Sequence, residues 1–156
     1  MNNAENRYYC DDSLKNEENE KWQYLLNYAF EKAEFVEFNV LYSNQEITSE
    51  IEALSKSLVE KSKRTEKIYA NGNYYVRYFL SDKMKEFIKS KKYGDWEGYN
   101  YEDISFIKDG KEFLATNTHE NLIILKMNKN LKEKLTEKGF DFWCDWGINP
   151  AKSEKN

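Results

Sequence analysis

The fold is decided by the stretch Ile104–Trp146, which reads ISFIKDGKEFLATNTHENLIILKMNKNLKEKLTEKGFDFWCDW. It contains most of the strongest apolar runs of the chain. Asp109-Gly110 stands between two of these runs and is typical of a tight hairpin turn, because both residues accept a positive φ. The segment His119–Asn121 turns the chain into a third strand, LIILKM, and Gly139 ends the helix that follows. We therefore expect the rest of the chain to cover or extend the sheet that this stretch forms.

Helical spacing of apolar residues predicts three helices upstream of this stretch, the third a short one capped by Ser81 or Asp82. The first covers residues 19–34, where one apolar stripe repeats at helical intervals. The second begins with Ser49 and Glu52, which have the spacing of a capping box. Its apolar positions continue at helical spacing through Leu58 and Val59. The opposite side of this second helix is rich in lysine and is expected to face solvent.

Alternating and aromatic runs predict the strands of the N-terminal half. The run FVEFNVLY over residues 35–42 alternates and is typical of a strand. Asn71-Gly72 predicts a second hairpin, in whose register Glu66 lies opposite Arg77. Because hairpin connections dominate, we expect an α+β fold. It should have a largely antiparallel sheet of about five to six strands, with helices packed on one face.

Length and composition predict one domain with flexible ends. A chain of 156 residues buries enough surface for a hydrophobic core. The aromatic content of 16% argues against disorder of the body, because burying aromatic side chains offsets the entropy of ordering the chain. Residues 1–18 are polar and acidic and are expected to form a flexible arm. We expect a single α+β domain over 19–148 and a flexible tail over 149–156.

The charge distribution limits the classes of partner. The net charge is −4, and residues 1–20 account for all of it with six acidic and two basic side chains. This argues against a protein that coats nucleic acid, which needs a sustained positive stripe. No secretory signal follows Met1, and no apolar run approaches the length of a membrane span. We expect a cytoplasmic protein in which Cys10 and Cys144 are thiols.

Few residues in the sequence point to catalysis. His119 is the single histidine, and it lies in a predicted turn. No phosphate-binding glycine loop, nucleophile elbow or zinc motif occurs. The sequence therefore predicts no catalytic residue, no metal site and no cofactor. The alternative left open is a small enzyme or ligand-binding protein whose pocket is built from His119, Cys144 and carboxylates.

Two stretches mix aromatic and acidic residues, DWEGYNYED at 95–103 and FDFWCDW at 140–146. Tyrosine and tryptophan are enriched at the centres of protein interfaces, and carboxylates steer a basic partner toward them. The alternative is that these aromatic residues fill the core while the acids face solvent. The predicted partner-binding residues are Asp95, Trp96, Glu97, Tyr99, Tyr101, Asp141, Trp143 and Asp145.

The leading hypothesis is a non-enzymatic intracellular binding protein that neutralises a basic protein partner through this acidic aromatic surface. Immunity proteins, antitoxins and phage inhibitors have this general character. Nucleic-acid binding is a weaker hypothesis, which would use Arg77 with Tyr74, Tyr75 and Tyr78 to stack bases. The overall negative charge and the lack of an RNA-binding aromatic motif argue against it.

Overall fold

The structure is a computed structural model that describes residues 5–10, 19–40, 49–63, 74–97 and 101–144. The helices are α1 (Glu20–Lys32), α2 (Ser49–Glu52), α3 (Asp82–Lys89) and α4 (Lys129–Glu137), with 3-10 turns at Ser55–Ser57 and Tyr93–Trp96. The strands are β1 (Asn6–Cys10), β2 (Phe35–Val40), β3 (Leu58–Lys63), β4 (Tyr74–Phe79), β5 (Glu102–Lys108), β6 (Lys111–Asn117), β7 (Leu122–Met127) and β8 (Trp143–Cys144).

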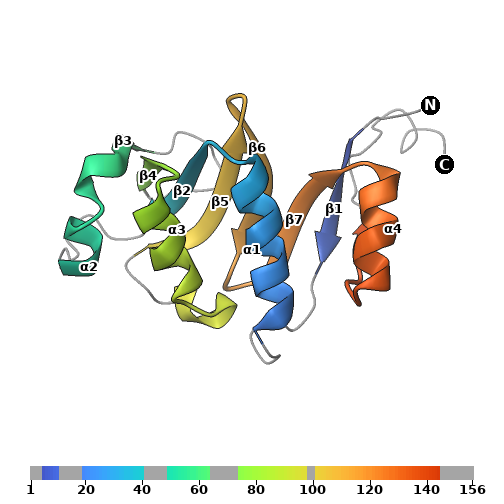
Figure 1. Cartoon of the computed structure of the whole chain (residues 1–156). Helices are drawn as coiled ribbons and strands as arrows, with labels where there is room; N and C mark the ends of the chain where they lie inside the picture. The colour runs from blue at the N-terminus through green and yellow to red at the C-terminus, as the bar shows by residue number, and fades with distance from the viewer. Residues whose placement is uncertain (1–4, 11–18, 41–48, 64–73, 98–100, 145–156) are drawn as a thin grey trace.

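All of these strands join one sheet in the order β3-β4-β2-β5-β6-β7-β1-β8, and every pairing is antiparallel (Figure 1). The predicted α+β class and antiparallel sheet are confirmed. The predicted number of strands is too low, because the sheet has eight when the two-residue β8 is included. The hairpin between β5 and β6 turns at Asp109-Gly110, whose φ angles of 51° and 71° match the predicted turn.

The N-terminal strand β1 is the main addition to the predicted sheet. It pairs with β7 on one side and with β8 on the other, and Tyr8 and Cys10 are buried. The prediction of a flexible arm over 1–18 is therefore wrong for residues 6–10. Only two buried apolar side chains mark this strand, and its partners lie near the other end of the chain. The other parts of that arm and the predicted tail over 149–156 lie outside the described residues, apart from Glu5.

Strand β3 replaces the second half of the predicted second helix. Helix α2 ends at Glu52, and Leu58 begins a strand that pairs with β4. Short apolar runs fit both helical and extended spacing, and β-branched residues favour strands. Glu60, rather than the predicted Glu66, pairs with Arg77. The predicted turn at Asn71-Gly72 lies outside the described residues.

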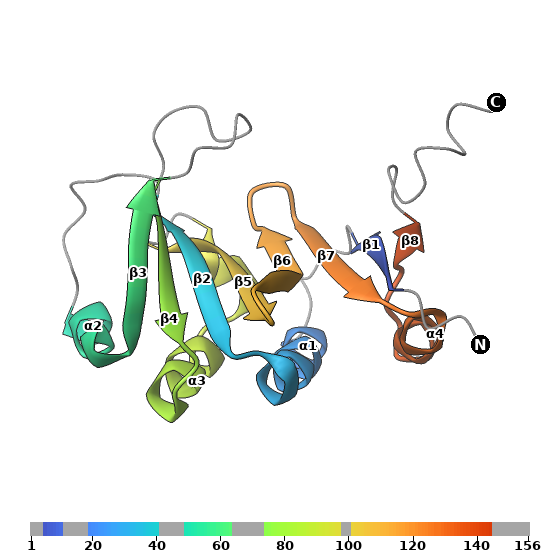
Figure 2. The same ribbon diagram turned by 90° about the horizontal axis from the view of Figure 1, so that it is seen from above.

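One face of the sheet carries buried apolar side chains of the hydrophobic core, against which α1 packs. Val36 and Phe38 of β2 point to this face, and Phe106 of β5 does so in the paired register. Phe30 of α1 packs edge-on against Phe106 with ring centroids 5.9 Å apart. Figure 2 draws α1 and α3 along this side of the strands. Trp96 stacks on Phe38 with ring centroids 5.4 Å apart and has no exposed surface.

Two tryptophan substitutions separate core from surface. Trp96→Ala removes a fully buried indole, and we expect it to lower the free energy of unfolding by about 3–5 kcal/mol. Trp143 is 43% exposed, and we expect Trp143→Ala to lower the same free energy by less than about 1 kcal/mol. Urea denaturation followed by far-UV circular dichroism measures both values. Equal losses would contradict the placement of Trp96 in the core.

Candidate functional site

The face of the sheet opposite the core is polar at its centre, and we call it the polar face. Glu37 and Asn39 of β2 point to it, as do Glu102 and Ser105 of β5 in the paired register. All four residues are at most 5% exposed. Burying a polar side chain is unfavourable unless it finds a hydrogen-bonding partner. A sheet face that only contacted solvent would carry exposed polar residues, whereas these four are buried. This arrangement marks the polar face as the candidate functional surface.

An ion pair between Arg77 and Glu37 forms the first part of this surface. Arg77 donates to Glu37 Oε2 from Nη2 at 2.9 Å and from Nε at 3.1 Å. Its guanidinium also lies over the ring of Tyr75, whose hydroxyl donates to Glu60. The guanidinium of Arg77 is therefore already paired with carboxylates of the protein. Tyr78 is buried on the core face, so the structure does not assemble the base-stacking surface predicted from this strand.

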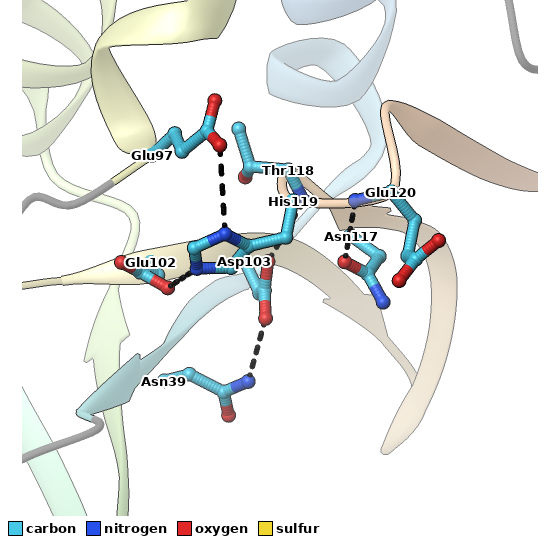
Figure 3. A network of polar contacts seen from close by, with 8 residues as sticks. All are labelled: Asn39, Glu97, Glu102, Asp103, Asn117, Thr118, His119 and Glu120. Carbon is cyan, nitrogen blue, oxygen red and sulfur yellow. Dashed lines mark hydrogen bonds and ion pairs between the residues drawn. The ribbon is translucent and has the colours of Figure 1, made fainter.

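A bulge at the start of β5 builds the second part (Figure 3). Asp103 has a φ of 51°, which interrupts the register between β5 and β2. Its Oδ2 accepts a hydrogen bond from Asn39 Nδ2 at 3.0 Å, and its Oδ1 accepts one from the backbone N–H of Thr118 at 2.9 Å. One carboxylate thus ties the middle of the sheet to the turn between β6 and β7, which fixes the backbone beside His119.

His119 lies between two carboxylates (Figure 3). Its Nε2 is 2.9 Å from Glu102 Oε2, and its Nδ1 is 3.5 Å from Glu97 Oε1. The His119 side chain is 52% exposed, whereas that of Glu102 is only 3% exposed. A neutral imidazole has one N–H, so only the doubly protonated ring donates to both carboxylates. Each ring nitrogen of half-exposed His119 thus faces a carboxylate.

The phenol of Tyr93 lies close to the same carboxylates. Burial raises the pKa of Tyr93, and the negative charge of Asp103 raises it further. The neutral hydroxyl donates to the carbonyl of Leu122 at 3.2 Å, where β7 begins. Tyr93 thus anchors the strand that leaves the His119 turn.

We call the surface around His119 the acidic end of the molecule. Glu97 and Glu102 flank the His119 ring, and Asp103 holds the turn that carries it. Glu120 follows His119 in the chain with its side chain directed away from the ring (Figure 3), and Asp95 lies two residues before Glu97 in the sequence. Asp95, Glu97 and Glu120 are exposed, whereas Glu102 is buried and Asp103 is partly buried. Within the part of the chain that the structure describes, no three histidine, cysteine or carboxylate side chains are placed to share a metal ion.

The first predicted aromatic–acidic stretch divides between core and surface. Trp96 is in the core, and Tyr101 stacks on Phe38 while its hydroxyl shares a 2.8 Å hydrogen bond with that of Tyr78. Asp95 accepts a hydrogen bond from the backbone N–H of Lys92 and caps the 3-10 turn. For Trp96 and Tyr101 the core alternative is correct, because Phe38 offers both of its ring faces to them. Tyr99 lies outside the described residues.

The second stretch keeps its predicted alternation where it is described. Phe140 and Phe142 are buried, whereas Asp141 and Trp143 are exposed. The indole of Trp143 stacks on Tyr9 of β1, with ring centroids 5.5 Å apart and planes inclined by 25°. Asp145 lies outside the described residues.

The two residues named in the alternative hypothesis belong to different parts of the sheet. Cys144 lies on β8, while His119 follows β6, and β7 and β1 separate these two strands. Strands β6 and β8 are three strand spacings apart, which amounts to about 14 Å.

No protein-family model matches the chain, and comparisons with curated proteins and with solved structures find no significant match. Among the described residues, no helix is both long enough and apolar enough to cross a membrane.

A double-mutant cycle tests the pairing of His119. We expect His119→Ala and Glu102→Gln to couple by about 1–3 kcal/mol in the free energy of unfolding, because Glu102 is buried and loses its partner. The matched cycle of His119→Ala with Glu97→Gln should give less than about 0.5 kcal/mol, because that pair is exposed and long. Urea denaturation of the single and double variants gives both coupling energies. A larger coupling to Glu97 than to Glu102 would contradict the described geometry.

Proposed function

We propose that the protein is a non-enzymatic binding protein that neutralises a basic protein partner, which docks at the acidic end. The observation that carries the proposal is the pair of carboxylates, exposed Glu97 and buried Glu102, that flank half-exposed His119. The hydrogen bonds of Asp103 fix the backbone beneath them. Such a surface is preorganised, so binding a cation orders few additional side chains.

A lysine or arginine of the partner is the group that this surface suits best. Glu97 and Glu102 already hold an imidazole between them, and a guanidinium presents a similar planar arrangement of N–H donors. An incoming arginine that replaced the ring of His119 would meet the oxygens of both carboxylates. The surrounding exposed acids would steer the basic partner and raise the association rate.

Immunity proteins, antitoxins and phage inhibitors all act in this way, and a cytoplasmic location agrees with that role. Asp141 and Trp143 stay predicted contacts of the same partner. Trp143 and Glu37 lie in one cross-strand row of the polar face, which runs through Ser105 and Tyr9. A partner of ordinary interface size, about 800 Å² on each side, would reach from the acidic end toward that row.

Charge reversal at the acidic end tests the proposal. The partner is first captured from the native host with the whole chain as bait, identified and purified. We expect the double variant Glu97→Lys/Glu120→Lys to bind it at least about tenfold more weakly, mainly through a slower association rate. Surface plasmon resonance at low and moderate salt measures both rates.

The matched control is Glu133→Lys/Glu137→Lys, which reverses two exposed carboxylates on α4. It makes the same change in net charge away from the acidic end and should bind as the wild type does. Equal weakening by both double variants, or a captured partner without a basic surface, would overturn the proposal.

A further inference from the structure

A second surface lies elsewhere on the polar face, at the strands β6, β7 and β1. Here the side chains enclose a shallow hollow of about 60 Å³, whose lining includes Arg7, Tyr9, Glu112, Ile124 and Lys126. Pockets that enclose a small organic molecule usually measure about 300 Å³ or more. The hollow is therefore a platform across which an extended ligand can lie, and it is too small to enclose one.

Two cations face each other across this hollow. Arg7 and Lys126 are directly paired in the register of β1 and β7, so their side chains point to the same face. Neither has an ion pair with any residue that the structure describes. Like charges at directly opposed positions destabilise a sheet. Glu112 supplies one carboxylate at the border, which leaves a local excess of positive charge that an anion would neutralise.

An aromatic wall stands beside the cations. Tyr9 lines the hollow and is two residues from Arg7 on the same strand face, a separation of about 6.6 Å. On the next strand, Trp143 stacks against Tyr9. Trp143 thus backs the tyrosine ring, while Ile124 pairs with Tyr9 on the side of the hollow.

We propose that this surface binds single-stranded nucleic acid, with a base against Tyr9 and a neighbouring phosphate between Arg7 and Lys126. Proteins that bind single strands combine aromatic side chains, on which bases stack, with cations that follow the backbone. Both elements occur here one strand repeat apart, on an open surface. An acidic protein segment would offer carboxylates to the cations but no base to stack against the aromatic wall.

The site is local, because the chain as a whole carries a net charge of −4. Asp141, two residues from Trp143, is also exposed and reduces the positive potential near the wall. Two phosphate contacts predict that the logarithm of the binding constant falls with the logarithm of the salt concentration with a slope of about −1.4. Binding should therefore be strong enough to measure only at low salt.

The test uses the whole chain and a fluorescent thymidine oligonucleotide of about 12 nucleotides, a length within the usual site sizes. Fluorescence anisotropy at salt concentrations from about 50 to 200 mM gives the affinity and its slope. We expect the double variant Arg7→Gln/Lys126→Gln to remove most of the salt dependence of the binding constant. We expect Tyr9→Ala to weaken binding about tenfold. The control Lys134→Gln, at an exposed position of α4, should leave both the affinity and its salt dependence close to the wild-type values. Circular dichroism verifies that each variant is folded.

Three further ligands carry anionic groups that could also bind Arg7 and Lys126, and they are compared with the single strand: thymidine monophosphate, duplex DNA and a polyglutamate peptide. We expect each to bind at least about tenfold more weakly than the single strand, because none offers several unpaired bases next to several phosphates. Stronger binding of polyglutamate would assign the surface to an acidic protein partner and overturn the proposal. Absence of oligonucleotide binding at low salt, or equal binding by wild type and Arg7→Gln/Lys126→Gln, would also overturn it.

Discussion

The carboxylate of Asp103 is the contact on which the candidate surface depends. It accepts hydrogen bonds from Asn39 in the middle of the sheet and from Thr118 in the turn between β6 and β7. The bulge at Asp103 also shifts β5, so that Glu102 pairs with Asn39 and reaches His119. Together with the hydrogen bond from Thr116 Oγ1 to the carbonyl of Ile104, this link holds His119 next to the buried carboxylate of Glu102. The acidic end is therefore a product of the sheet register and is not a flexible cluster of acids.

The two faces of the sheet differ in the side chains that they carry. The core face packs Phe38 between Trp96 and Tyr101 and brings α1 against β5. The polar face keeps buried carboxylates at its centre, an acidic end around His119, and the hollow beside Tyr9. Buried carboxylates lower stability unless they are paired. On the polar face Glu37 is paired with Arg77 and Glu102 with His119.

Sequence patterns predicted the features that depend on residues adjacent in the chain. The turn at Asp109-Gly110 and the alternation of Phe140 to Trp143 follow from local backbone preferences, and both are present. The sequence did not predict β1 or the β3 register, because strand pairing joins distant segments. The pairing of Glu102 with His119 was missed for the same reason, since it follows from a bulge that no glycine marks. Trp96 was assigned to the surface because acids flank it, yet those acids point outward while its ring fills the core.

The central claim is that a basic protein docks on the acidic end. Hydrogen–deuterium exchange of the chain, alone and saturated with its purified partner, tests this most directly, because it maps contact without substitutions. The account predicts slower exchange in the turn around His119 and in the segment that carries Glu97, with little change along α4. Protection confined to α3 and α4, with none at the His119 turn, would contradict it.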